Sequence, residues 1–277
     1  MRVRHQLFDR LIPMKFATWN INSIRQRRDL VLQWLEREQP DVLGLQEIKC
    51  TDDQFPADAF REAGYESVVV GQKSYNGVAI LSRVPFTLAH RTLPGWETDP
   101  PQARYVEIRT DTLTFGNLYL PNGNSGGEAG YDNKLSFMAA LREHARDMLR
   151  AGTDFVLAGD YNVCPTDKDL APGALSPDDA LVRPASRAAF RSLLWLGLTD
   201  ALRALHPVGR FYTFWDYQAG AWQRDSGLCI DHALLSPRVA ERLLTAMPDR
   251  EERGMKQPSD HVPLVVTLRD GDGKLES

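Results

Sequence analysis

The sequence is poor in cysteine and has no long apolar run. Its three cysteines stand far apart, at positions 50, 164 and 229, and none belongs to a CxxC pair. This spacing argues against a disulfide framework or a cysteine zinc site and favours a reducing compartment. No apolar run approaches the roughly 18 residues of a membrane-spanning helix. We therefore predict a cytoplasmic protein without a membrane partner.

The chain also lacks a strong charge of one sign and several common catalytic motifs. Its net charge is -4, so composition alone does not indicate a nucleic-acid partner. Carboxylates around a cation can nevertheless lie beside a local Lys/Arg face that meets phosphate. The sequence contains no HExxH or GxxxxGK(S/T), and its GxSxG match, GNSGG at residues 123–127, is a run of turn-forming residues. The two absences argue against a zinc protease helix and a P-loop.

Length and the absence of repeats favour a single α/β domain. The chain has 277 residues, 43% of them hydrophobic, and no low-complexity segment or long linker divides it. We assign residues 14–269 to this domain. Residues 1–13 are basic and partly apolar but have no continuous apolar segment or small-residue cleavage site. We expect them to be an N-terminal extension that need not be ordered, and not a signal peptide. Residues 270–277 are expected to be a polar tail.

Apolar runs bounded by turn residues predict about ten strands. The clearest cover residues 14–20, 42–47, 65–71, 77–83, 104–110, 113–120, 154–160, 228–236 and 262–268. Helical spacing of apolar residues predicts a helix from a cap at Ser23 to the residues before Pro40, and others over 131–150 and 186–196. So many strands rarely remain in one open sheet, so we expect two packed sheets with helices outside them.

Polar side chains of the kinds used in catalysis follow the predicted strands. Rigid strand ends hold such side chains in place, so they are candidates for one site. Asp160 and Asn162 are two positions apart at a strand end, so they are expected to point the same way. The candidates are Asn20, Asn22, Gln46, Glu47, Tyr119, Asn122, Asp160, Asn162, Asp231, His232, Ser259, Asp260 and His261.

Taken singly, most of these residues have an ordinary structural explanation. Glu47 fits a surface acid at a strand end, and Tyr119 fits a core residue with one hydrogen bond. His261 and Asp260 fit a turn. Asp231 is harder to explain, because it lies in an apolar strand and a buried carboxylate needs a partner. His261, next to the following strand, is the available partner.

Together, the same residues supply what metal-assisted hydrolysis requires. Glu47, with Asn22 and Asp260 as candidates for the remaining positions, offers the hard oxygen ligands that Mg²⁺ prefers. The set also contains an imidazole with a carboxylate to orient it, a free carboxylate for a water, and amide donors. This combination predicts attack of water on a phosphodiester.

Several motifs, in order along the chain, resemble the exonuclease III family, the DNA-repair branch of the endonuclease/exonuclease/phosphatase superfamily. The resemblance covers residues 14–268 and rests on WNINSIRQR, PDVLGLQEIK, GVAILSR, NLYLPNG, LAGDYNVCPTD, RFYTFWDY, SGLCIDHALLS and KQPSDHVPL. It implies a four-layered α/β sandwich, with two packed mixed sheets flanked by helices. It also implies a Mg²⁺-dependent enzyme, with Mn²⁺ able to substitute, that cuts DNA 5′ to abasic sites and trims 3′ ends. The implied partner is double-stranded DNA, especially abasic or 3′-blocked. We also predict a monomer in the cytoplasm that associates with the nucleoid during repair.

The resemblance also implies roles for individual residues. Glu47 becomes the principal metal ligand, helped by Asp260 and by Asn22, where some relatives carry Asp. Asp160 becomes the group that positions or deprotonates the attacking water. Tyr119 becomes a phosphate contact that also helps the leaving oxygen. The remaining contacts to the phosphate or to Asp160 are Asn20, Asn162 and His261, the last held by Asp231.

Substrate choice is predicted from two further sets of residues. By position, the apolar pocket for a sugar without its base is formed by Phe214, Leu228 and Ile230, although these side chains also fit an ordinary core. Isolated surface cations are commonly just solvated, but five lie near the motif loops and are candidates for contacts to the DNA backbone. They are Lys49, Lys73, Arg104, Arg224 and Lys256.

Two other classes of function remain open. Enzymes with the same superfamily core act on inositol phosphates, sphingomyelin or RNA tails, and the whole-length match of motifs argues against them. An inactive DNA-binding protein is expected to have lost Glu47, Asp160 or His261, and this chain retains all three. The balance between cleavage at abasic sites and 3′→5′ exonuclease activity depends on the loops at 95–103 and 215–228, and the sequence leaves it open.

Overall fold

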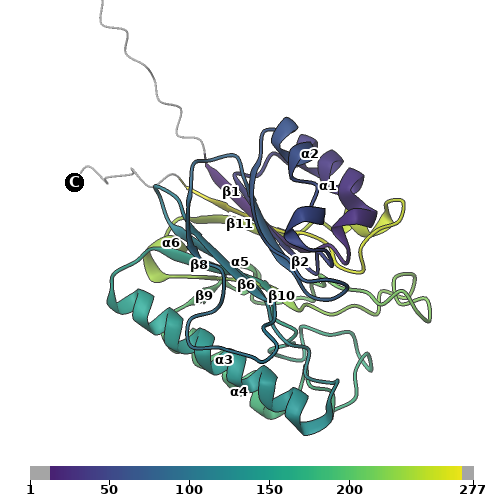
Figure 1. Cartoon of the computed structure of the whole chain (residues 1–277). Helices are drawn as coiled ribbons and strands as arrows, with labels where there is room; N and C mark the ends of the chain where they lie inside the picture. The colour runs from purple at the N-terminus through teal and green to yellow at the C-terminus, as the bar shows by residue number, and fades with distance from the viewer. Residues whose placement is uncertain (1–12, 270–277) are drawn as a thin grey trace, which may run out of the picture.

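The computed structural model describes residues 13–269, in which two six-stranded sheets pack face to face (Figure 1). The predicted tail over 270–277 and all of the predicted extension except Pro13 lie outside the described residues, so both stay predictions. The first sheet has the order β11 (Leu243–Pro248), β12 (Leu264–Leu268), β1 (Met14–Asn20), β2 (Val42–Gln46), β4 (Val78–Ser82) and β3 (Glu66–Val70). The second has the order β5 (Thr87–His90), β6 (Tyr105–Arg109), β7 (Thr114–Tyr119), β8 (Phe155–Asp160), β10 (Asp231–Leu235) and β9 (Thr199–Asp200).

Both sheets are mixed, and each contains one parallel pair. In the first sheet β1 and β2 are parallel, and in the second β7 and β8 are parallel. Parallel neighbours need a long crossover, and here it is a helix in each case. These helices are α1 (Ile24–Glu38) and α3 (Gly127–Arg150). The parallel pairs therefore end at the same side of the molecule as the starts of these two helices.

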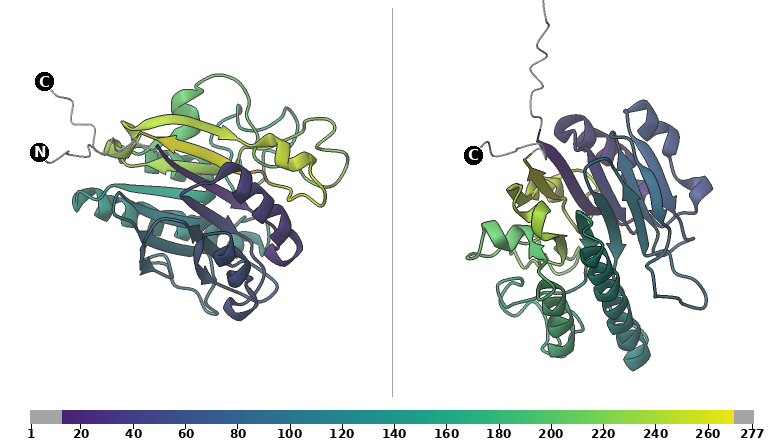
Figure 2. Two further views of the ribbon diagram at one scale, coloured as in Figure 1. Left: turned by 90° about the horizontal axis from the view of Figure 1, so that it is seen from above. Right: turned by 90° about the vertical axis from the view of Figure 1, so that its left-hand side faces the viewer.

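Helices cover the outer face of each sheet, which gives four layers (Figure 2). Helix α1 and the short α2 (Ala57–Glu62) lie on the first sheet, and α3 with α4 (Pro184–Leu194) lies on the second. The remaining short helices are α5 (Ala201–Leu205), α6 (Pro237–Ala240), η1 (Asp52–Gln54) and η2 (Arg250–Gly254). The predicted four-layered sandwich is confirmed. Within residues 13–269, no helix combines the length and the apolar character needed to cross a membrane.

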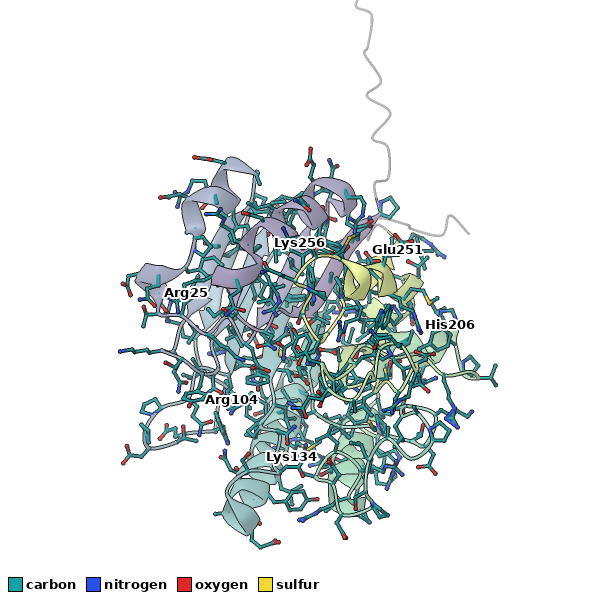
Figure 3. All side chains as sticks on the ribbon, turned by 90° about the vertical axis from the view of Figure 1, so that its right-hand side faces the viewer. Arg25, Arg104, Lys134, His206, Glu251 and Lys256 are labelled. Atoms are coloured by element: carbon teal, nitrogen blue, oxygen red, sulfur yellow. The ribbon has the colours of Figure 1, made fainter. Side chains whose placement is uncertain are left out.

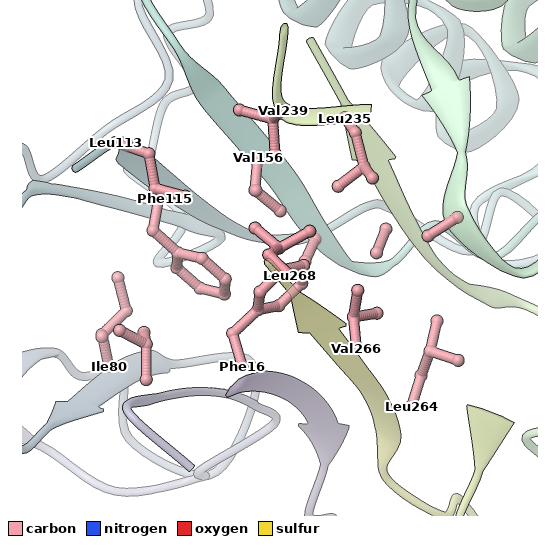
Figure 4. Packing of buried hydrophobic residues seen from close by; sticks show 14 of the residues in the cluster. Phe16, Ile80, Leu113, Phe115, Val156, Leu235, Val239, Leu264, Val266 and Leu268 are labelled. Carbon is pink, nitrogen blue, oxygen red and sulfur yellow. The ribbon is translucent and has the colours of Figure 1, made fainter. Parts of the chain in front are cut away.

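Alternation along the strands explains why there are three apolar layers. In β1, Phe16 points to the space between the sheets, whereas Ala17 and Trp19 pack under α1. Successive strand side chains face opposite sides, so a strand that is buried on both faces is apolar throughout. The central cluster between the sheets is shown in Figure 4, with Phe16 against Phe115 at its middle. Cys50, Cys164 and Cys229 are all buried and free, as the sequence predicts.

Most element boundaries agree with the predictions, and three differences have clear causes. The predicted cap at Ser23 makes no side-chain hydrogen bond, because the backbone amides of Ser23 and Ile24 instead donate to the carbonyls of Glu47 and Ile48. Helix α3 begins one turn earlier than predicted, in a glycine-rich turn that helix propensity disfavours. Strands β5 and β11 were not predicted, because few of their residues are buried and the apolar pattern is weak.

Candidate active site

Most of the predicted polar residues meet at the end of the molecule where the central strands of both sheets stop. Two do not: His232 contacts Asp200 Oδ2 at 3.1 Å and the Val163 carbonyl at 3.0 Å, and Gln46 Nε2 donates to Thr18 Oγ1 and Asn117 Oδ1. Asn20 is the last residue of β1, and Tyr119 and Asp160 are register partners at the ends of the parallel strands β7 and β8. Asp231 begins β10 and lies opposite Asp160. Figure 3 views the molecule from this end, with Arg25, Arg104, Lys134 and Lys256 labelled around it.

Asn20 connects the two sheets through its side chain. Its Nδ2 donates to Glu47 Oε1 at 2.8 Å and to Asp160 Oδ2 at 2.9 Å. Its Oδ1 accepts from the backbone amide of Asn22 at 3.1 Å. Asn20 is fully buried, so this amide fixes the separation of the two carboxylates. The candidate metal ligand and the candidate base are therefore held by one side chain.

Asp160 is buried and has a donor on each carboxylate oxygen. The backbone amide of Asn162 donates to Oδ1 at 2.9 Å, and Asn20 donates to Oδ2. Burial raises the pKa of Asp160, against the opposing effect of the nearby His261. A carboxylate with a raised pKa accepts a proton more readily than an ordinary aspartate. The site thus orients Asp160 and strengthens it as a base.

The predicted contact between Asp231 and His261 is present. His261 Nδ1 lies 2.9 Å from Asp231 Oδ2, and His261 Nε2 lies 3.8 Å from Asp160 Oδ2. Burial opposes protonation of His261, but the charge and hydrogen bond of Asp231 raise the pKa of this imidazole. The histidine therefore keeps its proton and presents Nε2–H as a donor. We call Asp160, Asp231 and His261 the acid-rich cluster.

The turn that carries His261 is tied to the first strand. Ser259 Oγ donates to the Asn20 carbonyl at 2.7 Å, and Trp19 Nε1 donates to the His261 carbonyl at 3.1 Å. The backbone amide of Trp215 donates to the Asp260 carbonyl at 2.8 Å. These bonds hold both Asp260 and His261 against the end of β1.

Glu47, Asn22 and Asp260, the predicted metal ligands, lie in one chain of contacts. Lys49 Nζ lies 2.9 Å from Glu47 Oε2 and also donates to Asn22 Oδ1, while Asn22 Nδ2 donates to Asp260 Oδ1 at 3.0 Å. Burial alone would raise the pKa of Glu47, but the charge of Lys49 and the Asn20 hydrogen bond keep it below its usual value. The donor set is all oxygen and attracts a cation, so these residues fit Mg²⁺.

Tyr119 stands beside these carboxylates with Arg104 stacked on its ring. The Arg104 guanidinium carbon lies 4.7 Å from the ring centroid, and Arg104 Nη1 donates to the Tyr119 carbonyl at 3.2 Å. Burial and the charges of Glu47 and Asp160 raise the pKa of Tyr119 well above its usual value. The hydroxyl therefore stays protonated and can donate.

Asn162 organises the loop after β7. Its Nδ2 donates to the Leu120 carbonyl at 2.9 Å, and its Oδ1 accepts from Asn122 Nδ2 at 3.0 Å. With its backbone amide on Asp160, this residue joins the candidate base to the loop that contains Asn122. The side-chain amide of Asn122 is thereby brought to the same site.

Lys134 is a component of this arrangement that the sequence interpretation missed. It is fully buried in α3, and its Nζ donates to the carbonyls of Asn162 at 2.6 Å and Asn122 at 2.9 Å. Burial lowers the pKa of Lys134 to about 7. One sequence feature points to this residue, because Lys134 shares the helical spacing of the apolar stripe that continues at Met138 and Leu141.

Left-handed backbone is concentrated here. Asn22, Ser23, Glu47, Lys49 and Asn162 all have φ between 45° and 86°. Non-glycine residues adopt this region at a cost of about 1–3 kcal/mol each. The surrounding hydrogen bonds hold the chain in this conformation, and such strain is typical of functional sites.

The three residues predicted to form the abasic-sugar pocket lie next to this site, and Phe214 contacts His261 directly. Phe214 packs its ring edge-on at 5.0 Å from the His261 ring, and its backbone pairs with both Leu228 and His261. Leu228 and Ile230 are buried in a small apolar cluster with Cys164. Their role as a pocket stays a prediction.

The five cations predicted to contact DNA divide into two groups. Lys49 and Arg104 lie within the site itself, on Glu47 and Tyr119 respectively. Lys73, Arg224 and Lys256 are exposed, and contact with DNA stays a prediction for all five. Two arginines that were not among these five, Arg25 and Arg27, line one surface cavity together with Asn22, Lys49 and Tyr217.

Comparison with known proteins agrees with this geometry. The model of the endonuclease/exonuclease/phosphatase family matches residues 17–261. The chain belongs to this family. It is 32% identical to exodeoxyribonuclease III of Haemophilus influenzae over 268 residues, which cover 92% of this chain and 100% of that protein. It is 29% identical to the DNA repair nuclease APEX1 of Danio rerio, over 94% of this chain and 83% of that protein.

Two solved structures have the same fold as this chain. A 3′-5′ exonuclease from Neisseria meningitidis superposes with a TM-score of 0.88 at 39% identity, covering 92% of this chain and 100% of that one. An AP endonuclease from Archaeoglobus fulgidus superposes with a TM-score of 0.84 at 34% identity, covering 92% and 99%. The exonuclease III resemblance inferred from the motifs is thereby confirmed.

Proposed function

We propose that this family member is a Mg²⁺-dependent DNA repair phosphodiesterase. It hydrolyses the phosphodiester 5′ to abasic sites and trims 3′ ends of duplex DNA as a 3′→5′ exonuclease. The observation that carries the proposal is the shared contact of Asn20 with Glu47 and Asp160. This contact places a candidate metal ligand beside a buried base, as water attack on a phosphodiester requires. The names of the curated and structural relatives support the DNA substrate.

Asp160 acts on the water in this mechanism. Its two oxygens are oriented by Asn20 Nδ2 and the Asn162 amide, and its raised pKa favours proton acceptance. The proton of the attacking water passes to Asp160, while the new P–O bond forms and the bond to the 3′ oxygen breaks. General-base assistance of this kind contributes on the order of 10²–10⁴ in rate.

The donors of the site meet the charge on the phosphate. His261 presents Nε2–H, and Tyr119 presents a protonated hydroxyl near the leaving oxygen. Each preorganised donor is worth about 10²–10³ in rate. When bound at Glu47, Asn22 and Asp260, Mg²⁺ or Mn²⁺ supplies neutralisation of the phosphate charge and stabilisation of the leaving oxygen.

Lesion recognition is proposed for the Phe214 side of the site. The position of Phe214 against His261 supports contact with a sugar that has no base, because extrusion of such a nucleotide loses little stacking. Lys73, Arg224 and Lys256 are proposed to contact the backbone of double-stranded DNA. A monomer in the cytoplasm, acting at the nucleoid, stays a prediction.

The test is cleavage of a 5′-labelled duplex that holds one abasic-site analogue. We expect one nick 5′ to the lesion with Mg²⁺ or Mn²⁺ and none with EDTA. A ladder that shortens from the 3′ end would show that exonuclease activity dominates. No cleavage with either metal would contradict the proposal, and release of phosphate from inositol phosphates would then assign the chain to another branch of the family.

The matched control is Glu47→Gln, which keeps the shape of the side chain but removes its charge. If cleavage depends on the metal at this site, the variant requires far more Mg²⁺ than the wild type. Unchanged Mg²⁺ dependence would exclude Glu47 as the principal ligand.

A further inference from the structure

A second group of titratable side chains lies away from the candidate active site. His90 ends β5, Glu107 lies in β6, and His144 lies in α3, which packs on this sheet. His90 and Glu107 are register partners, and an irregularity in β5 between Leu88 and His90 directs the histidine. Glu107 pairs with Gly116 in β7, three residues before the strand end that carries Tyr119. We call these three residues the imidazole-rich cluster.

The geometry places one imidazole on each oxygen of a single carboxylate. His144 Nε2 lies 2.6 Å from Glu107 Oε2, and His90 Nε2 lies 3.9 Å from Glu107 Oε1. One donor atom from each residue falls within 4.8 Å of the other two. Ligands of a tetrahedral zinc ion lie roughly 3.4 Å apart, given bond lengths of about 2.1 Å. Small side-chain rotations therefore suffice to bring all three onto one ion.

The carboxylate is held in place by a buried tyrosine. Tyr105 donates its hydroxyl hydrogen to Glu107 Oε2 at 2.6 Å. The sheet leaves room for this hydroxyl only because residue 116 is glycine, since a Cβ there would approach the Tyr105 oxygen to 2.6 Å. Oε2 thus accepts from both Tyr105 and His144, and Oε1 faces His90 beyond hydrogen-bond distance. Outer hydrogen bonds of this kind orient the ligands of metal sites.

Burial and charge suit a cation that enters from one side. Glu107 is 1% exposed, whereas the side chains of His144 and His90 are 9% and 39% exposed. Burial alone would raise the pKa of Glu107, but hydrogen bonds from His144 and Tyr105 keep it below its usual value. The carboxylate is therefore ionised, and His90 provides the solvent-facing entrance.

We propose that His90, Glu107 and His144 bind one divalent transition-metal ion, with Zn²⁺ the best match. Two imidazoles and one carboxylate select this class of ion over Mg²⁺, which prefers oxygen ligands. Three protein ligands leave a fourth position for water. Each imidazole ligates through a ring nitrogen that carries no proton. The ion joins the edge strand β5 to α3, so it stabilises the second sheet at a place separate from the catalytic residues.

The test is calorimetric titration of Zn²⁺ into EDTA-treated, dialysed, untagged protein. We expect one binding event that survives in Glu47→Gln and weakens by at least about a hundredfold in His90→Ala, because loss of a ligand exceeds the 10–100-fold effect of an outer partner. His206→Ala, which changes a histidine elsewhere on the molecule, is the matched control and should bind like the wild type. Co²⁺ in place of Zn²⁺ should give the visible absorption of a low-symmetry site in the wild type and not in His90→Ala.

Two outcomes would overturn the proposal. Equal Zn²⁺ affinity in the wild type and His90→Ala would show that the cluster is only a hydrogen-bonded anchor for β5. Loss of the binding event in Glu47→Gln would place the ion at the candidate active site instead. His90→Ala changes the most exposed member, so it should fold normally, and its melting temperature without metal verifies this.

Discussion

The two clusters of this molecule use the same chemical groups in opposite proportions. The acid-rich cluster sets two carboxylates around one imidazole, and the imidazole-rich cluster sets two imidazoles around one carboxylate. In the first, His261 Nδ1 lies 2.9 Å from Asp231. In the second, His144 Nε2 lies 2.6 Å from Glu107. The contact distances are thus similar. The group present twice, here called the surplus group, is the carboxylate in the first cluster and the imidazole in the second.

The surplus group decides what each cluster can do. Surplus carboxylate keeps the imidazole protonated, as the raised pKa of His261 shows, so this histidine donates a hydrogen bond and is unsuited to ligate a metal. In the imidazole-rich cluster, two ring nitrogens instead lie beside one carboxylate, and the pKa of that carboxylate, Glu107, is below its usual value. The first arrangement favours proton transfer near phosphate, and the second favours binding of a transition metal.

The largest expected effect is that of Asp160→Asn. The substitution removes the proton acceptor of the acid-rich cluster while the side chain keeps its shape. We expect single-turnover cleavage to fall by about 10³ or more, within the range for a general base, and binding to duplex DNA to change little. Cleavage and fluorescence anisotropy on the same abasic duplex would measure both. Cleavage within tenfold of the wild type would remove Asp160 from this role.

Removing one carboxylate charge from the acid-rich cluster should change how cleavage activity depends on pH. In Asp231→Asn, His261 loses the charge that raises its pKa, which then moves toward the ordinary value of about 6.5. An imidazole is protonated below its pKa, so the variant should lose activity as the pH rises from 6 to 8, whereas this step should be absent in the wild type. At pH 8 we expect a loss of about 10²–10³, the value of one donor. Parallel pH profiles for the two proteins would contradict this explanation.

A smaller effect is expected for Lys134→Met, which leaves both clusters intact. The Asn122 and Asn162 carbonyls lose their shared donor, so the loop that supports Asp160 should shift. We expect cleavage to fall on the order of tenfold to a hundredfold, with Lys168→Met, an exposed lysine, as the control. Kinetics with thermal unfolding would show whether activity falls more than stability does. Equal activity in both variants would make Lys134 purely structural.

The smallest effect is expected for His90→Ala under Mg²⁺. This residue makes no described contact with the candidate active site, so cleavage should stay within about twofold of the wild type, as for most surface substitutions. Abasic-site cleavage at saturating Mg²⁺ would measure it. A large loss would show that the two clusters are coupled through the second sheet.

The sequence locates Asn20, Asp160 and Asp231 correctly at strand ends, because these residues follow or begin the strongest strands. The runs ending at Asn20 and Asp160 are apolar on both faces, and only buried strands have that pattern. The pairing of Asp231 with His261 followed from the cost of a buried carboxylate. These inferences use local pattern or one strong energetic requirement.

The features that were missed depend on contacts that no local pattern encodes. The imidazole-rich cluster joins an exposed edge strand, a second strand and a distant helix, and each residue alone looks ordinary. Lys49 was predicted as a DNA contact, but its contact with Glu47 was missed; the ammonium lies 2.9 Å from Glu47 Oε2, and both residues have left-handed backbone. Strand β11 has few buried residues, so its position follows only from its pairing with β12.

The pairing of β1 with β12 has a consequence for synthesis of the chain. Met14 lies opposite Leu268, and Thr18 lies opposite Leu264, so this edge of β1 stays unpaired until β12 has been synthesised. Domains generally begin to fold from the N-terminus as they emerge from the ribosome. Here the first sheet, and with it the histidine on the turn before β12, can be completed only after β12 has emerged. A nascent chain that has not yet extended beyond β12 therefore carries no assembled site.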